Sequence, residues 1–256
     1  MAIRISAELS HLCPLDEITT HAAALEAHGF FRLWVPDTVV SPWEAWLAAS
    51  IIMQTTRRVQ IGLGVTNPYT RHPVVMAQMA ATMQRCSGER LTLSVGKGIG
   101  RFLDKAGIQQ HDTAVEECVT IVRRLMAGER TSFVGKAFQI DAMLLRTVPP
   151  AISVPIFLAA IGPAGWESAM RIADGVVTVW SETLAETRQR WMAERPLPTA
   201  VLIPFAQRRS DFFAHPVSTV SELQRRVATL ERAAFDEVIV AYADLADLDT
   251  AARLLG

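Results

Sequence analysis

The chain has few cysteines and no long apolar run, and each shortage excludes a class of protein. Cys13, Cys86 and Cys118 are odd in number and lack Cys-x-x-Cys spacing, which argues against a disulfide framework and a structural zinc site. The richest apolar run, residues 45–53, ends at Gln54, well short of the ~18 residues that suggest a membrane-spanning helix. The first residues show no basic segment followed by a long apolar stretch, so we expect no signal peptide and a cytoplasmic protein.

Net charge is also nearly absent. The 25 basic side chains balance 26 acidic ones to a formal charge of −1, so no overall field attracts nucleic acid or an anionic membrane, and we expect neither partner. The sequence contains no His-Glu-x-x-His motif or similar cluster, so no metal is expected, and no Gly-x-Ser-x-Gly motif of an α/β-hydrolase.

Two alternating kinds of segment fill the 256 residues. Short runs rich in β-branched residues alternate with longer segments of helical period. The strands are expected at 3–9, 32–37, 59–66, 90–98, 154–161, 175–180, 199–206 and 236–242. The helices are expected at 15–29, 41–56, 72–86, 112–128, 162–173, 184–194, 217–235 and 245–256, and a hairpin-like excursion at 131–144.

Eight such strand–helix units predict an α/β fold, a (β/α)8 TIM barrel formed by residues 1–256 as one domain. Strands joined by crossover helices pair in parallel, and eight of them can close into a barrel of about this chain length. The alternative is an open doubly wound sheet, which is expected to carry a glycine-rich loop after its first strand. The segment SHLCPLDE that follows strand 3–9 contains no glycine, which favours the barrel.

Barrel active sites lie at the C-terminal ends of the strands, and polar residues concentrate there in the segment VTNPYTRHP, residues 65–73. Two prolines stiffen this loop. Pro73 suits the first position of a helix, so His72 is either a structural N-cap or a site residue.

Three glycine-containing segments also lie at strand ends. In GLG (62–64) the glycines permit a bulge or close approach of a flat ligand, or they clear space for packing. SVGKGIGR (94–101) could cradle a phosphate with backbone N–H groups beside Lys97, or it is a flexible connection. AAIGPAG (159–165) leaves space over the barrel mouth and begins a helix at Pro163, or it allows a close helix–strand crossing.

Several side chains at these strand ends are candidates for chemistry. Glu8 and Asp37 could donate a proton if burial raises their pKa. Salt bridges to Arg32, Arg71 or Arg101 would explain the same residues without chemistry. Of six tryptophans, Trp43 and Trp180 are the two expected against a planar ligand. The residues assigned to substrate contact are His11, Tyr69, Trp180 and Arg208.

The second and third predicted helices carry more apolar surface than one barrel-facing stripe requires. Segments 43–53 and 74–83 supply it, so we expect a homodimer through these two helices.

The segments GFFRLWVPD, SPWEAW, VTNPYTRHP and AAIGPAGWESAMRIADGVV resemble the luciferase-like flavin and deazaflavin oxidoreductases. The nearest branch is similar to 5,10-methylenetetrahydromethanopterin reductase. The resemblance covers residues 1–180 and, more loosely, 217–256. It implies a (β/α)8 barrel, usually homodimeric, that holds FMN or coenzyme F420 at its C-terminal mouth.

The resemblance also assigns roles to residues. It implies a bulge with a non-prolyl cis peptide at Gly64, Val65 and Thr66, behind the cofactor ring. It places Asp37 and Trp43 near the ring and Glu8 toward the substrate. The positions implied near the cofactor tail are Gly96, Lys97 and Gly98, with Ala159, Ala160, Gly162 and Pro163 beside them; Asn67 is added from the strand 59–66 loop.

Three departures from the family pattern stand out. Thr38 replaces a histidine that is common after the strand 2 aspartate, and GKGIGR lacks the terminal acid of the reductase motif. The insertion usual after strand 6 or 7 is missing. These departures weigh against methanopterin as the substrate.

The sequence therefore predicts a coenzyme F420-dependent oxidoreductase that transfers a hydride to or from a small organic substrate. Glu8, Asp37 and His72 are the candidate proton donors. One alternative is an FMNH2-dependent monooxygenase on the same barrel, and another is a flavin-binding protein without catalysis.

Overall fold

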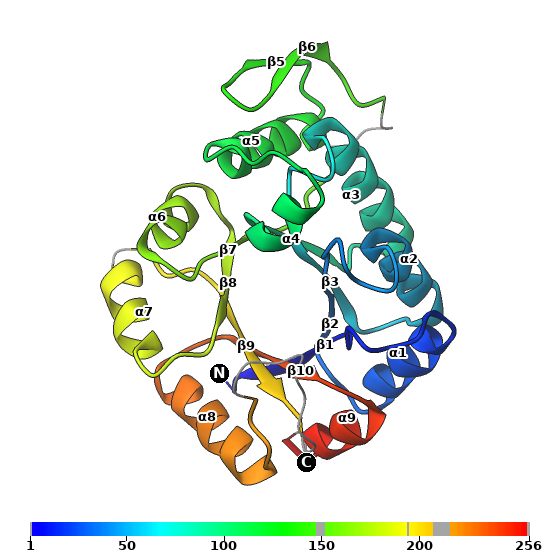
Figure 1. Cartoon of the computed structure of the whole chain (residues 1–256), viewed down its shortest axis with the longest axis vertical. Helices are drawn as coiled ribbons and strands as arrows, with labels where there is room; N and C mark the ends of the chain where they lie inside the picture. Colours follow the sequence, from blue (N-terminus) through cyan, green and yellow to red (C-terminus); the bar gives the residue numbers. More distant parts are fainter. Residues whose placement is uncertain (1, 147–151, 194, 207–215, 255–256) are drawn as a thin grey trace.

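Eight parallel strands form a closed barrel with helices around it (Figure 1). The computed structural model describes residues 2–146, 152–193, 195–206 and 216–254. The strands follow one another around the barrel in the order β1-β10-β9-β8-β7-β4-β3-β2, which confirms the predicted fold class. Their bounds are β1 (Arg4–Glu8), β2 (Arg32–Val35), β3 (Gln60–Thr66), β4 (Leu91–Val95), β7 (Ile156–Ala159), β8 (Gly175–Val179), β9 (Thr199–Phe205) and β10 (Glu237–Tyr242).

The helices follow the expected alternation with shorter bounds and one addition. They are α1 (Ile18–Ala27), preceded by the 3-10 helix η1 (Leu15–Glu17), α2 (Ala45–Thr55), α3 (Pro73–Ser87), α4 (Gly100–Lys105), α5 (Ala114–Met126), α6 (Pro163–Ile172), α7 (Leu184–Met192), α8 (Val220–Arg232) and α9 (Leu245–Ala251), followed by η2 (Ala252–Leu254). Helix α4 is absent from the predicted set, because the glycines at its start are typical of a loop.

A small aromatic and aliphatic core fills the barrel interior. It consists of Trp34, Phe157, Val177, Ala200 and Ile239. Two glycines make room for the rings. A Cβ on Gly62 would lie 2.3 Å from the Trp34 ring, and a Cβ on Gly175 would lie 2.5 Å from the Phe157 ring.

A buried ion pair joins the starts of two strands. Arg32 Nη1 donates to Glu237 Oε2 at 2.9 Å, and neither side chain is more than 7% exposed. Arg32 also lies over the rings of Phe31 and Trp34. This pair lies at the N-terminal ends of β2 and β10, so the opposite end of the barrel is the one that can open to a ligand.

An antiparallel hairpin projects from the barrel beyond α3 and α5 (Figure 1). Its strands are β5 (Thr131–Val134) and β6 (Gln139–Met143), as the excursion at 131–144 predicts. The Glu117 carboxylate on α5 accepts the backbone N–H groups of residues 136, 137 and 138 at 2.9–3.0 Å. Phe138 packs edge-on against His72 at 5.4 Å between ring centroids.

None of the helices in the described part of the chain is both long and apolar enough to cross a membrane.

Candidate active site at the barrel mouth

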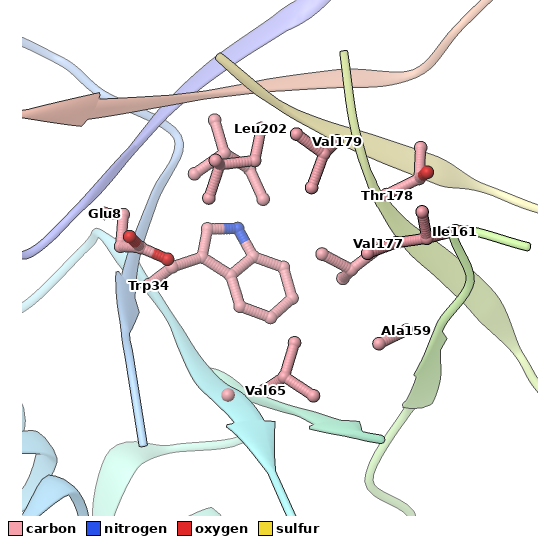
Figure 2. Close-up of a pocket in the computed structure, with 11 residues that line it drawn as sticks. Glu8, Trp34, Val65, Ala159, Ile161, Val177, Thr178, Val179 and Leu202 are labelled. Atoms are coloured by element: carbon pink, nitrogen blue, oxygen red, sulfur yellow. The ribbon is translucent and has the colours of Figure 1, made fainter. Parts of the chain in front are cut away.

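A cavity of about 100 Å³ lies at the C-terminal end of the barrel strands (Figure 2). Strands or strand ends on most sides of the barrel contribute to it. Its lining residues are Glu8, Trp34, Gly64, Val65, Ala159, Ile161, Val177, Thr178, Val179, Leu202 and Ile239. Most of these side chains are aliphatic, and the Trp34 indole lies among them in Figure 2.

A bulge at the end of β3 forms one wall. The register between β3 and β4 shifts between Leu63 and Thr66, and the Gly64–Val65 peptide is cis, as the family resemblance implies. Gly64 has φ 144°, and a Cβ there would lie 2.6 Å from the Ser94 carbonyl oxygen. A Cβ on Gly96 would lie 2.6 Å from Val65 Cγ1. Glycine at 64 and 96 therefore allows the bulge to lie close against β4.

Among the described residues that line the cavity, Glu8 carries the carboxylate. It ends β1, and its Oε1 lies 3.6 Å from His11 Nε2. The two side chains are 12% and 13% exposed, so both keep some access to solvent. Of the three candidate proton donors, Glu8 is the one that the structure places among the lining residues.

Asp37 lies in a network outside this lining. Its Oδ2 accepts hydrogen bonds from Thr66 Oγ1 at 2.6 Å and from Arg71 Nη1 at 2.7 Å. Arg71 also pairs with Glu44, whose side chain caps the N-terminus of α2. Asp37 thus forms a salt bridge with Arg71, one of the arginines that the sequence suggests for it. The network connects the ends of β2 and β3 to α2.

The segment VTNPYTRHP has a structural explanation for much of its polarity. Asn67 is buried, and its Oδ1 accepts the backbone N–H groups of Tyr69 and Thr70. The Tyr69 hydroxyl donates to the carbonyl of His111 at 3.0 Å. His72 is exposed and caps α3 by accepting the N–H of Val74, so the N-cap alternative describes it.

The residues expected around a cofactor tail lie at two adjacent strand ends. Lys97 and Gly98 are exposed after β4, and Lys97 pairs with the exposed Asp112 at 3.1 Å. Across the β4–β7 pair, Ala160 is buried, whereas Gly162 and Pro163 are exposed. A Cβ on Gly162 would meet nothing within 4 Å.

These residues fit a flavin-like cofactor. The apolar cavity with its bulge can take part of a planar ring, and the open space at Gly162 adjoins the start of α6. Lys97 and Gly98 follow β4 at the same end of the barrel as the cavity, and both are exposed.

The tryptophan at the cavity wall is not one of the two that are expected against a planar ligand. Trp34 lines the cavity, while Trp43 is buried and donates from Nε1 to the carbonyl of Cys13. Trp180 is partly buried beneath the guanidinium of Arg226. The strand register could have indicated Trp34, because this large residue pairs with Gly62 on the neighbouring strand, where the glycine leaves room for its ring. Arg208 lies outside the described residues.

Comparisons with known proteins agree with this architecture. An F420-dependent hydroxymycolic acid dehydrogenase from Mycobacterium tuberculosis is 33% identical over 176 residues, covering 62% of this chain and 48% of the relative. A 5,10-methylenetetrahydromethanopterin reductase from Methanolobus tindarius is 29% identical over 166 residues, covering 64% and 50%. The chain thus spans about half the length of the curated relatives it matches.

A solved structure of an F420-dependent secondary alcohol dehydrogenase, in complex with an F420–acetone adduct, has the same fold. It superposes with a TM-score of 0.83 at 20% identity and covers 99% of this chain and 98% of that one. The family model described as luciferase-like monooxygenase matches residues 1–195. By this match the chain belongs to the luciferase-like monooxygenase family.

Proposed function

We propose that the protein is an oxidoreductase that uses coenzyme F420 to transfer a hydride to or from a small organic substrate. The observation that carries the proposal is the cavity at the barrel mouth, where aliphatic walls and the β3 bulge surround one carboxylate, Glu8. The relatives whose names include F420 support this choice of cofactor.

Each part of the site has a separate task in this proposal. The bound deazaflavin supplies a carbon that accepts or donates a hydride. Val65 and Trp34 support and orient the ring, and the aliphatic walls exclude water from its face. Lys97 and the backbone at Gly98 bind the anionic tail.

Glu8 holds the proton that accompanies hydride transfer. When an alcohol is oxidised, Glu8 takes the hydroxyl proton; when a carbonyl is reduced, it returns that proton to the oxygen. His11 lies 3.6 Å away and can exchange the proton with solvent through its partly exposed ring.

The alternative is an FMN-dependent monooxygenase, favoured by the description of the family model. Such an enzyme must keep water from the reduced flavin while oxygen reacts. The relatives whose names include F420 favour hydride transfer over this alternative. A flavin-binding protein without catalysis is the remaining possibility, and it predicts binding with no turnover.

Titration of the purified protein with coenzyme F420 and with FMN, followed by tryptophan quenching, tests the cofactor. We expect tighter binding of F420, and then a change in deazaflavin absorbance when the complex meets a substrate. Gly162→Asp is the variant that tests where the cofactor binds. It puts a negative charge into the open space at the start of α6 and should weaken binding of the anionic cofactor. Gly107→Asn is its control at an exposed turn with positive φ. Preference for FMN would contradict the F420 assignment, and F420 binding without turnover of any substrate would favour the non-catalytic protein.

We also propose that the chain forms a homodimer through α2 and α3. Leu47 on α2 and Val75 on α3 are large apolar side chains that stay exposed in the single chain. Light scattering should give twice the chain mass, and Leu47→Glu should reduce it to the mass of one chain. A monomeric parent protein would contradict the proposal.

A further inference from the structure

A turn after β1 brings His11 within 3.6 Å of Glu8, the two side chains that the proposed proton transfer uses. Ser10 builds this turn. Its carbonyl accepts the N–H of Cys13 at 3.0 Å, and its Oγ accepts the N–H of Leu12 at 3.1 Å. Ser10 is buried, whereas the His11 side chain keeps some access to solvent. The position of the His11 ring beside Glu8 therefore depends on how firmly Ser10 is held.

The end of β10 holds Ser10 by two hydrogen bonds. β10 is the neighbour of β1 in the barrel (Figure 1). The Ser10 hydroxyl donates to the Ala243 carbonyl at 2.6 Å. Burial raises the pKa of the Tyr242 phenol and a backbone hydrogen bond from Ser10 lowers it, as expected when a phenol oxygen accepts an N–H group. Two consecutive residues at the end of β10 thus fix both the side chain and the backbone of Ser10.

His21 on α1 completes the arrangement. It is 3% exposed, and its Nδ1 lies 2.8 Å from the Tyr242 hydroxyl, with the two rings stacked at 5.6 Å between centroids. Because the phenol oxygen accepts from Ser10, its O–H proton needs an acceptor, and a neutral His21 with an unprotonated Nδ1 supplies one. Burial lowers the pKa of His21, which favours the neutral ring. This tautomer leaves the proton on Nε2, 3.7 Å from Glu17 Oε2.

We infer that Tyr242 and His21 are positioning residues for the Glu8–His11 pair. This inference rests on the proposed function, in which Glu8 exchanges the proton, and it adds two residues on which that step depends. Neither belongs to the described residues that line the cavity. The Tyr242 hydroxyl fixes the Ser10 backbone, and Ser10 fixes the turn that carries His11. A packing role alone would require the Tyr242 ring and not its hydroxyl, so removal of the hydroxyl distinguishes the two roles.

NMR spectroscopy of the protein without cofactor tests the positioning. Tyr242→Phe keeps the ring and removes the hydroxyl, so the Ser10 amide should exchange its hydrogen about 3–10-fold faster. The ring signals of His11 should shift in the same variant. Thr199→Val is the control, because it removes another buried hydroxyl, bonded to the Leu197 carbonyl at 3.0 Å, at the opposite end of the barrel. Parent-like signals in Tyr242→Phe, or equal changes in both variants, would overturn the inference.

A double-mutant cycle tests the contribution of His21. His21→Phe keeps a ring at this position but removes the acceptor for the phenol proton, so it should also quicken exchange of the Ser10 amide. If His21 acts through the Tyr242 hydroxyl, His21→Phe should have little further effect in the Tyr242→Phe background. Fully additive effects of the two substitutions would overturn the role of His21.

Kinetics connect the positioning to the reaction. With F420 and a substrate that the parent protein turns over, Tyr242→Phe should lower kcat about 10-fold and leave the dissociation constant for F420 unchanged. An unchanged kcat beside shifted His11 signals would overturn the role in proton transfer. Because the NMR measurements need no cofactor, a failure to bind F420 would contradict the proposed cofactor alone, and parent-like His11 signals would contradict the positioning alone.

Discussion

The indole Nε1 of Trp34 donates a hydrogen bond to Glu237 Oε1 at 2.8 Å. Because the other carboxylate oxygen accepts from Arg32, one buried side chain orients both a cation and the aromatic ring that lines the cavity. The residues that close the barrel interior thereby fix the orientation of one wall of the site at its mouth.

Removing this carboxylate should destabilise the barrel strongly. Glu237→Ala leaves Arg32 charged, buried and unpaired, and breaking such a pair costs about 3–5 kcal/mol. Urea unfolding at pH 7 measures the loss. Glu167→Ala, at an exposed position on α6, should change stability by less than about 0.5 kcal/mol. Equal stability of the two variants would contradict the prediction.

A methyl group at Gly62 should also destabilise the barrel, by less than the loss of the Glu237 carboxylate. The Cβ of Gly62→Ala would lie 2.3 Å from the Trp34 ring, so the ring must move at a cost of about 1–3 kcal/mol. Gly100→Ala is the control, because its Cβ would make ordinary contacts of 3.6 Å or more. In a Trp34→Leu background the Gly62→Ala change should cost less, and an unchanged cost would refute the ring contact as its cause.

The regular parts of the fold could be predicted because their signals are local. β-branched runs and helical periods recur along the chain, and Pro73 and Gly88 mark the two ends of α3. The bulge at Gly64 and Val65 was implied by the residues of the family motif, which the sequence contains.

The parts that could not be predicted depend on residues far apart in the chain. Arg32 and Glu237 are 205 positions apart, and no local pattern joins them. Nearness to a strand end in the sequence indicates Trp43 and Trp180 but not Trp34, which lines the cavity from within β2. Which interior layer a side chain occupies follows from barrel register, as the pairing of Trp34 with Gly62 shows.

Trp34 should report cofactor binding more strongly than Trp43. Trp34 lines the cavity, whereas Trp43 is buried with its Nε1 bonded to Cys13. Trp34→Phe should remove a larger share of the fluorescence quenching by F420 than Trp43→Phe. Fluorescence titration of both variants gives the comparison. A larger loss with Trp43→Phe would place the ring against that residue instead.

Glu8 should matter for the chemical step. Glu8→Gln keeps the shape of the side chain but cannot exchange a proton, so kcat should fall about 10²–10⁴-fold with F420 affinity little changed. Glu186→Gln, an exposed residue on α7, is the control. Stopped-flow measurement of the deazaflavin absorbance separates the hydride step from binding. Full kcat in Glu8→Gln would exclude it as the proton donor.

The attachment of the hairpin should depend on pH through Glu117. Burial raises the pKa of this carboxyl, but the Thr113 side chain and the backbone N–H groups of residues 136–138 together hold the pKa below its ordinary value. Since the folded pKa is the lower one, the stabilisation is complete above the ordinary value of 4.5 and is lost as pH falls through the folded value.

Hydrogen exchange of the amides at 136–138 therefore should quicken below about pH 4.5, relative to the intrinsic rate at each pH. Glu117→Gln should exchange faster than the parent at pH 7 and lose this pH dependence, because a neutral amide accepts these bonds less strongly. Glu129→Gln, an exposed position before β5, should keep the parent's profile. A parent profile in Glu117→Gln would mean that contacts such as Phe138 with His72 hold the hairpin without the carboxylate.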